Sequence, residues 1–233
     1  MIRLLLVEDD TNLSYIIQAA LEDMIGDYEV TTANNGKEGL DKYREIRPDI
    51  IVADIEMPVM DGYEMVRRIR ETDKETSIIF SSARVSPKDV VKGYELGVNN
   101  YVKKPFLPEE LDAHIHALLR MKQGGTEKEM SPTLTIGGYT LDPAQATLRH
   151  LSGSAQLLTP RETGILELLF NKPGEVVRRE VILDKFWNTE NDYFASRSLD
   201  VFVNKLRKLF IQDETVCIKT IKGIGLMLVC STS

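Results

Sequence analysis

The chain has 233 residues, of which 42% are hydrophobic and 28% charged, and its formal net charge is −7. This length and composition are typical of a globular protein with two domains, and they exclude a disordered or fibrous chain. No apolar run approaches the roughly 20 residues needed to cross a bilayer, and the N-terminal segment lacks the basic and apolar pattern of a secretory signal. We therefore expect a cytoplasmic protein without membrane contact.

Charge is divided unevenly along the chain. Residues 1–121 contain 15 Lys and Arg against 23 Asp and Glu, a net charge of −8, whereas residues 131–233 contain 12 against 11, a net charge of +1. An acidic domain cannot neutralise the phosphates of nucleic acid. Any DNA contact is therefore expected in the second half, through a local basic patch.

The first half alternates apolar, strand-like runs with amphipathic helical stretches. This alternation predicts a parallel sheet with helices on both faces. The runs lie at residues 2–7, 28–32, 50–53, 78–81 and 100–102.

Charged residues follow three of these runs. Glu8, Asp9 and Asp10 follow the first run, Asp54 the third and Lys104 the fifth. Single acids after a strand often only cap the next helix, as we expect of Asp10. The carboxyl ends of parallel strands, however, share one crevice, and clustered carboxylates are costly unless a divalent cation neutralises them. The pattern therefore predicts a Mg²⁺ site around Asp54 as nucleophile.

The second half begins after a polar, Gly-containing stretch that reads as a linker, residues 122–132. Thr159 and Glu162 form a capping box with Pro160 at the first helical position. Helices near 178–187 and 196–210 precede a hairpin over 217–230, an order that suggests a winged helix.

The helix over 196–210 is amphipathic. Its apolar stripe is expected to pack against the domain core. The opposite face is either a solvated surface or a DNA-reading surface. It carries Arg197, Val201, Asn204, Lys205 and Lys208, with Arg207 on the flank.

Seven segments in a fixed order resemble the two-component response regulators of the OmpR/PhoB family. They are LLLVEDD (4–10), PDIIVADIEMPVMDG (48–62), IIFSSA (78–83), YVKKPF (101–106), LTPRETGILELL (158–169), SRSLDVFVNKLRKLF (196–210) and IKTIKGIG (218–225). The resemblance implies an α/β, flavodoxin-like receiver with a doubly wound, parallel, five-stranded sheet over 1–121. It also implies the linker 122–132 and an α+β winged-helix DNA-binding domain over 133–233.

The resemblance also implies the chemistry of the receiver. A sensor histidine kinase would phosphorylate Asp54, and the chain would catalyse only its own phosphoryl uptake and loss. Mg²⁺ would be held by Glu8, Asp9, Asp54 and the backbone carbonyl of Glu56. The catalytic and switch residues would be Lys104, Ser82 and Tyr101. Of these, Lys104 would neutralise charge on the transferring oxygens, and Ser82 and Tyr101 would form the switch.

In the second domain the resemblance implies that the helix over 196–210 enters the major groove of promoter DNA. Asn204 and Val201 would face base edges, and the wing would contribute Thr220 and Lys222. The residues expected mainly at phosphates are Arg197, Lys205, Arg207 and Lys208. A loop beginning at Trp187 would face RNA polymerase; the alternative for Trp187 itself is a partly buried anchor.

Family members form homodimers on activation through charged residues of the fourth helix, fifth strand and fifth helix. Here the corresponding surface loses charge, and we expect a dimer with little salt dependence. Its residues would be Val90, Val91, Asn100, Glu110 and His114.

Two alternatives remain open. One is a winged-helix regulator that does not depend on phosphorylation, although its active-site residues are all present. The other is an aspartyl-phosphate hydrolase of the haloacid dehalogenase type, which would require a second Asp where Glu56 stands.

Cys217 and Cys230 have neither metal-ligand nor CxxC spacing. They flank the Gly223 and Ile224 turn symmetrically, so a regular hairpin would set them directly opposite each other. A cytosolic location nevertheless predicts two free thiols.

Overall fold

A computed structural model describes residues 1–83, 86–123, 132–153, 155–187 and 195–231. The chain divides into two compact units, residues 1–118 and 119–233. The boundary falls within helix α5 (Pro108–Gln123), and residues 124–131 of the predicted linker lie outside the described residues. Within the described ranges, no helix is long and apolar enough to cross a membrane.

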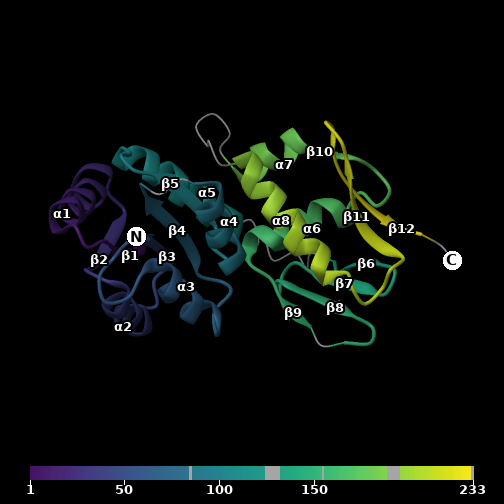
Figure 1. The fold of residues 1–233 in the computed structure, drawn as a ribbon, viewed down its shortest axis with the longest axis horizontal. Helices are drawn as coiled ribbons and strands as arrows, with labels where there is room; N and C mark the ends of the chain where they lie inside the picture. The colour runs from purple at the N-terminus through teal and green to yellow at the C-terminus, as the bar shows by residue number, and fades with distance from the viewer. Residues whose placement is uncertain (84–85, 124–131, 154, 188–194, 232–233) are drawn as a thin grey trace. The chain divides into compact units, whose positions relative to one another are not determined.

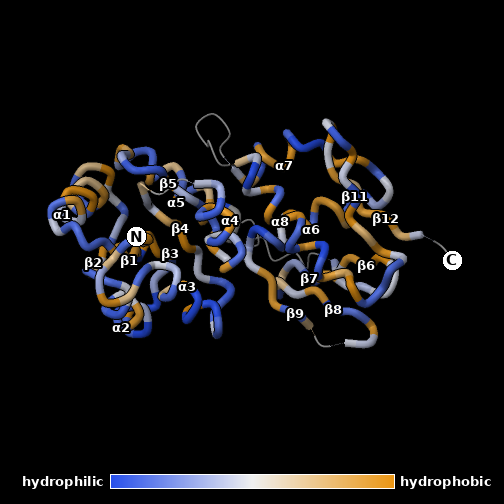
Figure 2. The backbone as a smooth tube through the Cα atoms, in the orientation of Figure 1, coloured by the Kyte–Doolittle hydropathy of each residue, from blue (hydrophilic) through white to orange (hydrophobic). Residues whose placement is uncertain are grey.

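The N-terminal unit contains a parallel sheet in the order β2-β1-β3-β4-β5. Its strands are β1 (Ile2–Val7), β2 (Tyr28–Ala33), β3 (Ile50–Asp54), β4 (Ser77–Ser82) and β5 (Asn100–Lys103). The central strands are apolar along their length because helices cover both faces. Figure 1 shows α2 and α3 on one side of the sheet and α5 on the other, and Figure 2 shows hydrophobic stretches along β1 and β3. The predicted doubly wound architecture is confirmed.

The helices of this unit begin at polar caps. Asp10 Oδ1 accepts hydrogen bonds from the backbone N–H groups of Asn12 and Leu13, which confirms Asp10 as the cap of the first helix. Asp61 caps α3 in the same way, and Ser86 caps α4. The elements are α1 (Thr11–Ala19), which continues into a π-helix (Ala20–Ile25), α2 (Gly36–Ile46), α3 (Gly62–Arg70), α4 (Pro87–Leu96) and α5.

The connection from α3 to β4 contains a buried polar network at the amino edge of the sheet. Arg70 is 3% exposed, and its guanidinium donates to the carbonyls of Gly97, Asp73 and Thr76 and to Asn99 Oδ1. The Asp73 carboxylate accepts from the Tyr43 hydroxyl at 2.7 Å, from the backbone N–H groups of Glu75 and Thr76, and from the Thr76 hydroxyl. The charges at this edge therefore have several partners each, as buried charges require.

The described residues of the C-terminal unit form two antiparallel sheets, in the orders β6-β7-β8-β9 and β10-β12-β11, with the helices α6, α7 and α8. The capping box at Thr159 and Glu162 is present. The last two helices and the final hairpin have the order of a winged helix, as predicted. The elements are β6 (Leu134–Ile136), β7 (Tyr139–Asp142), β8 (Thr147–His150), β9 (Gln156–Leu157), α6 (Pro160–Phe170), β10 (Val177–Arg178), α7 (Arg179–Phe186), α8 (Ala195–Leu209), β11 (Val216–Ile221) and β12 (Gly225–Cys230).

The register of the final hairpin differs from the prediction. Ile221 pairs with Gly225, so the turn contains three residues, with Gly223 at φ +74°. A three-residue turn shifts the pairing by one position: Cys217 pairs with Val229, and Cys230 pairs with Val216. The two cysteines are therefore not opposite each other, and both are free. Because successive side chains of a strand alternate between faces, they point to opposite faces of the hairpin.

Candidate functional site

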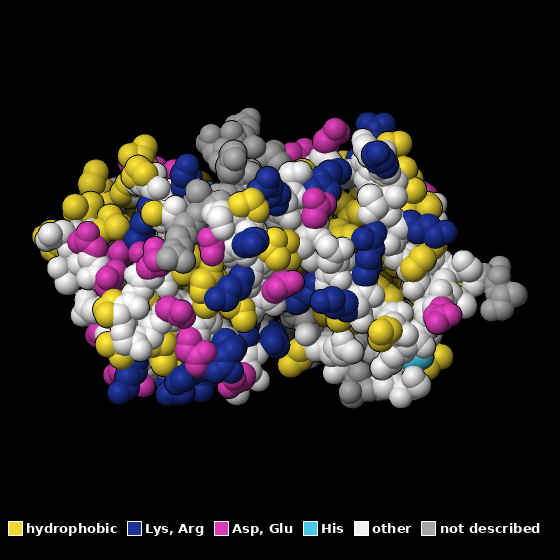
Figure 3. All heavy atoms as spheres, viewed as in Figure 1, with side chains coloured by type: hydrophobic (Ala, Val, Ile, Leu, Met, Phe, Trp, Pro, Cys, Tyr) yellow, Lys and Arg dark blue, Asp and Glu magenta, His cyan; other side chains and the backbone are white. Residues whose placement is uncertain are grey.

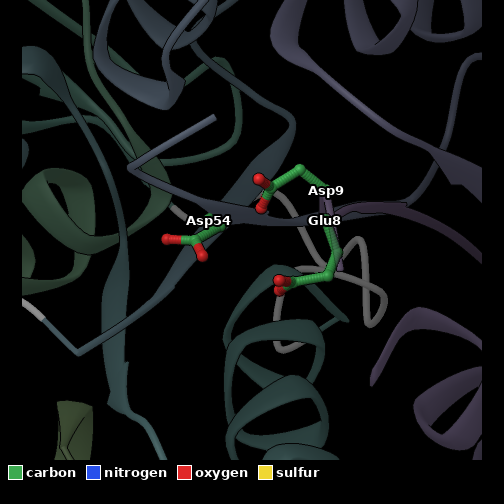
Figure 4. Close-up of side chains that lie close together, drawn as sticks. All are labelled: Glu8, Asp9 and Asp54. Carbon is green, nitrogen blue, oxygen red and sulfur yellow. The ribbon is translucent and has the colours of Figure 1, made fainter. Parts of the chain in front are cut away.

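Three carboxylates converge at the carboxyl edge of the parallel sheet. Asp54 ends β3, and Glu8 and Asp9 follow β1, its neighbour in the sheet. One carboxylate oxygen from each residue lies within 4.8 Å of the other two, and Figure 4 shows the three side chains close together. Glu8 is 1% exposed and Asp54 9%. Hard oxygen donors at this spacing suit a divalent cation such as Mg²⁺.

The Lys104 ammonium occupies the same crevice. Its Nζ atom lies 2.6 Å from Asp54 Oδ2 and 2.6 Å from Glu8 Oε2. Burial alone would lower the pKa of Lys104, but hydrogen bonds and charge attraction from Asp54 and Glu8 outweigh burial and raise that pKa. Burial raises the pKa of Glu8 above its ordinary value, although Lys104 acts in the opposite direction. The ammonium therefore remains charged beside the Asp54 carboxylate.

The loop after β3 turns back tightly against Asp54. Asp54 Oδ1 accepts from the backbone N–H groups of Ile55 at 2.5 Å and Glu56 at 3.2 Å. A Cβ atom at Gly62 would lie 2.2 Å from the Asp54 carbonyl oxygen, so this return requires glycine. Val59, at the tip of the loop, is 79% exposed and has φ +68°, a strained value for a β-branched residue. The side chain of Glu56 is exposed, so the backbone carbonyl is the group of Glu56 expected to reach a cation.

The two expected switch residues lie on neighbouring strands. Ser82 is buried at the end of β4, and its carbonyl accepts from the Lys104 N–H at 3.0 Å. Tyr101, on β5, is 2% exposed, and its hydroxyl donates to the Asp89 carbonyl at 3.0 Å. Burial raises the pKa of Tyr101, so the hydroxyl stays protonated as a donor. The neighbouring Ser81 is also buried, and it lies opposite Asp54 in the register of the β3–β4 strand pair.

The predicted dimer surface needs correction. Val90, Asn100 and His114 are at most 6% exposed, so they belong to the interior of the N-terminal unit and cannot form its surface. Asn100 Nδ2 and His114 Nδ1 are 2.8 Å apart within the same chain. Asn100 and His114, which were expected at a dimer surface, therefore form an internal contact between β5 and α5. Val91 and Glu110 remain partly exposed.

Helix α8 presents a polar face with both basic and acidic residues. Leu199, Phe202 and Leu206 are buried, as the apolar stripe predicts. Val201, expected at a base edge, is 8% exposed and packs in the interior, because its position falls beside the apolar stripe. The exposed residues at spacings of three and four are Arg197, Asp200, Asn204, Arg207 and Lys208. Figure 3 shows Lys and Arg side chains over the part of the C-terminal unit that carries α8.

Two of the predicted phosphate-binding cations have partners within the domain. Lys205 Nζ lies 2.6 Å from Glu162 Oε1 at the start of α6, and Glu162 is 5% exposed. The Arg207 guanidinium donates to the Ile218 carbonyl at 2.9 Å and to the Thr220 hydroxyl at 2.7 Å, which ties α8 to β11. Sequence spacing identified Glu162 only as a cap, because its contact with α8 is long-range.

The remaining predicted contacts lie on the hairpin and before α8. Thr220 and Lys222 are exposed at the end of β11 and in the turn. Trp187 is 1% exposed, and the Arg161 guanidinium carbon lies 4.3 Å from the centre of its ring. Trp187 is therefore a buried anchor, and residues 188–194 of the predicted polymerase-facing loop lie outside the described residues.

Comparisons with known proteins match both units. The response regulator receiver domain family matches residues 4–116, and the family described as transcriptional regulatory protein, C terminal, matches residues 153–228. The transcriptional regulatory protein TrcR of Mycobacterium tuberculosis is 37% identical over 229 residues, covering 97% of this chain and 86% of TrcR.

Solved structures include relatives over the full length. Response regulator DrrB, an OmpR/PhoB homolog from Thermotoga maritima, is 31% identical and covers 98% of this chain and 99% of DrrB, with a TM-score of 0.49. A mutant of RitR has a TM-score of 0.73 at 23% identity, over 98% of this chain and 99% of RitR, which shows a shared fold.

Proposed function

Because the chain belongs to the two-component response regulators of the OmpR/PhoB type, which are transcriptional regulators, we propose that phosphorylation of Asp54 controls its binding to promoter DNA. The observation that carries the proposal is the position of Lys104, 2.6 Å from both Asp54 and Glu8, beside three carboxylates within 4.8 Å of one another. A sensor histidine kinase would donate the phosphoryl group, and we propose that this chain acts in the cytoplasm.

The donor set suits Mg²⁺. Glu8, Asp9, Asp54 and the backbone carbonyl of Glu56 would hold the ion, because hard oxygen ligands and a few carboxylates are what Mg²⁺ prefers. When bound, the ion would neutralise charge on the transferring phosphoryl oxygens.

The chain's own residues orient the transfer. An Asp54 carboxylate oxygen attacks the phosphorus of the kinase phosphohistidine; the new O–P bond forms as the P–N bond breaks, and the released imidazole retains the bonding electron pair. Positioning and charge neutralisation do most of this work, since a carboxylate is a weak nucleophile. Lys104 already contacts Asp54 and is placed to pair with a phosphoryl oxygen. We assign Ser82 to the same oxygens and Tyr101 to the accompanying switch.

The C-terminal unit would bind double-stranded DNA through α8 and the β11–β12 hairpin. Asn204 is exposed and carries the amide that suits an adenine edge in the major groove. The proposed phosphate contacts are Arg197, Arg207, Lys208 and Thr220, with Lys222 at the minor groove. Lys205 is expected to contribute less, because Glu162 already pairs with it.

Activation would promote homodimerisation through the N-terminal unit. Of the predicted surface, Val91 and Glu110 are available for contact. We further propose contact with RNA polymerase at promoters, as for a transcription factor that binds upstream DNA.

Intact-protein mass spectrometry after incubation with acetyl phosphate tests the proposal. Wild-type protein should gain one phosphoryl group with Mg²⁺ and none with EDTA. Asp54→Asn should gain none, whereas Asp61→Asn, which removes a nearby carboxylate but retains a cap, should behave as wild type. An added phosphoryl group on Asp54→Asn would refute the assignment.

A DNA measurement tests the second half of the proposal. Duplexes enriched from a random pool should bind more tightly to the phosphorylated protein. Lys208→Ala should reduce the slope of log affinity against log salt by about one unit, because one phosphate contact is lost. Equal slopes for the variant and wild type would exclude that contact.

A further inference from the structure

One residue joins the hairpin turn to the start of α8. Arg179 is the first residue of α7, and its backbone N–H donates to the Ile224 carbonyl in the turn at 2.9 Å. Its side chain donates to Asp200 Oδ1 at 2.8 Å and to the Ser196 hydroxyl at 3.0 Å, and also to the Ser196 carbonyl. The backbone of Arg179 therefore contacts the hairpin while its guanidinium contacts α8.

The hairpin side of this junction is closely packed. Strand β10, which leads into Arg179, pairs with β12 through Val177 with Leu226 and Arg178 with Gly225. A Cβ atom at Gly225 would lie 2.0 Å from the Val177 carbonyl oxygen, so the two strands approach at a position that requires glycine. The residues before Arg179 are thus held against the hairpin by β-pairing. The Arg179 side chain in turn contacts α8, so it links the position of the hairpin to that of α8.

Asp200 is an acidic residue on the face of α8 that we propose binds DNA. It lies on the exposed face of α8 between Arg197 and Asn204, and 65% of its side chain is exposed. A carboxylate there repels DNA phosphates, so removing it would be expected to strengthen DNA binding if charge alone mattered. Its pairing with Arg179, whose planar fork can bind several acceptors at once, gives it a structural role.

We propose that Arg179 is a positioning residue: by holding Asp200 and Ser196 with its side chain and Ile224 with its backbone, it fixes the spacing between the recognition helix and the wing. The spacing lets major-groove and minor-groove contacts form together. This inference rests on the proposed DNA contacts of α8 and the hairpin, and it adds a residue that touches neither groove.

The test measures binding of the full chain to a duplex enriched by the wild type and to a scrambled duplex. Arg179→Ala keeps the backbone hydrogen bond to Ile224 and removes the guanidinium that contacts Asp200 and Ser196. We expect about a tenfold loss for the enriched duplex, the usual effect of losing a hydrogen bond to a charged group, and less than about twofold for the scrambled one.

The direction of the affinity change in Asp200→Ala distinguishes a positioning role from simple charge repulsion. Although this variant removes a negative charge, we expect a similar loss of about tenfold on the enriched duplex. The double variant should lose about tenfold rather than about a hundredfold, because both changes remove the same contact. Glu180→Ala is the matched control: it removes an exposed acid one residue from Arg179 and should bind as wild type or slightly more tightly.

Other outcomes would overturn the proposal. If Asp200→Ala tightened binding to both duplexes, and Arg179→Ala weakened both with a salt slope lower by about one, Arg179 would be a simple phosphate contact. Thermal unfolding checks that each variant is folded, and Asp200→Asn, which keeps the side-chain shape, replaces any variant that is not.

Asn204→Ala separates this inference from the function on which it rests. An unchanged ratio of affinities between the two duplexes in Asn204→Ala would refute base reading by α8. A ratio lost in Asn204→Ala but kept in Arg179→Ala and Asp200→Ala would refute the positioning role alone.

Discussion

At the carboxyl edge of the five-stranded sheet, the carboxylates of Glu8, Asp9 and Asp54 face the Lys104 ammonium, whereas at the amino edge Arg70 and Asp73 each have several hydrogen-bond partners. The like charges at the carboxyl edge repel one another, and the Lys104 ammonium and a bound cation would offset that repulsion. Satisfied charges at the other edge stabilise the fold. The sheet therefore keeps the proposed reactive site at one edge and a stabilising polar network at the other.

The largest effect is expected at the amino edge. Arg70→Met should lower the free energy of unfolding of the N-terminal unit by about 4 kcal/mol, because three buried acceptors lose their donor. Urea unfolding measures the loss. Phosphoryl uptake per folded molecule should stay as in wild type, and its loss in folded protein would break the separation between the two edges.

The next effect belongs to the carboxyl edge. Saturating Mg²⁺, at about a hundredfold over its dissociation constant, should stabilise the wild type by about 2.7 kcal/mol by mass action. Asp9→Asn should reduce this gain, since it removes one of the three converging carboxylates. Urea unfolding with Mg²⁺ and with EDTA measures the difference, with Asp73→Asn as the control that keeps the full gain. An equal gain in Asp9→Asn and wild type would exclude Asp9 as a ligand.

Asp73 gives a pH-dependent contrast. Burial opposes its ionisation, but hydrogen bonds from Thr76, Tyr43 and Glu75 outweigh burial and lower the pKa of Asp73 from 3.8 to about 2. Because the folded-state pKa is depressed, the stabilisation is complete above the ordinary pKa and disappears as pH falls toward 2. Asp73→Asn should therefore cost about 1.5 kcal/mol at pH 6, after allowance for partial exposure, and this cost should shrink as pH is lowered through about 2. A difference that persists unchanged down to pH 2 would contradict this origin.

The smallest effect concerns the strained loop tip after Asp54. Val59→Gly relieves a positive φ that costs about 1 kcal/mol, while the greater freedom of glycine in the unfolded chain opposes the gain. We expect a net stabilisation of about 0.5 kcal/mol by thermal unfolding. Val59→Ala, which keeps a Cβ atom, should not reproduce it. Destabilisation by glycine would show that the Val59 side chain makes favourable contacts that exceed the strain.

The cluster of charged residues at the carboxyl edge could be predicted from sequence, because residues that follow neighbouring parallel strands meet at one edge of the sheet. Asp54, Glu8 and Lys104 each follow an apolar run, and parallel strands bring such positions together. The five strands followed from the same alternation of apolar runs and amphipathic stretches.

Other features could not be predicted, because they depend on long-range contacts. Asn100 and His114 were expected at a dimer surface, and only the packing of α5 on β5 shows that the two side chains contact each other inside the unit. Val201 borders the apolar stripe, and spacing alone did not decide which side of that border it occupies. The pairing of Lys205 with Glu162 joins two residues more than 40 positions apart in sequence.

The register of the final hairpin determines how the two cysteines respond to oxidation during purification and storage. Cys217 and Cys230 project from opposite faces of the hairpin, so air oxidation cannot close a bridge within one folded molecule without moving the backbone. Cys230 is exposed, and oxidation would therefore join it to a second molecule. Covalent dimers formed in a purification without reductant would be artefacts of storage, and a maleimide dye would label Cys230 before the more sheltered Cys217.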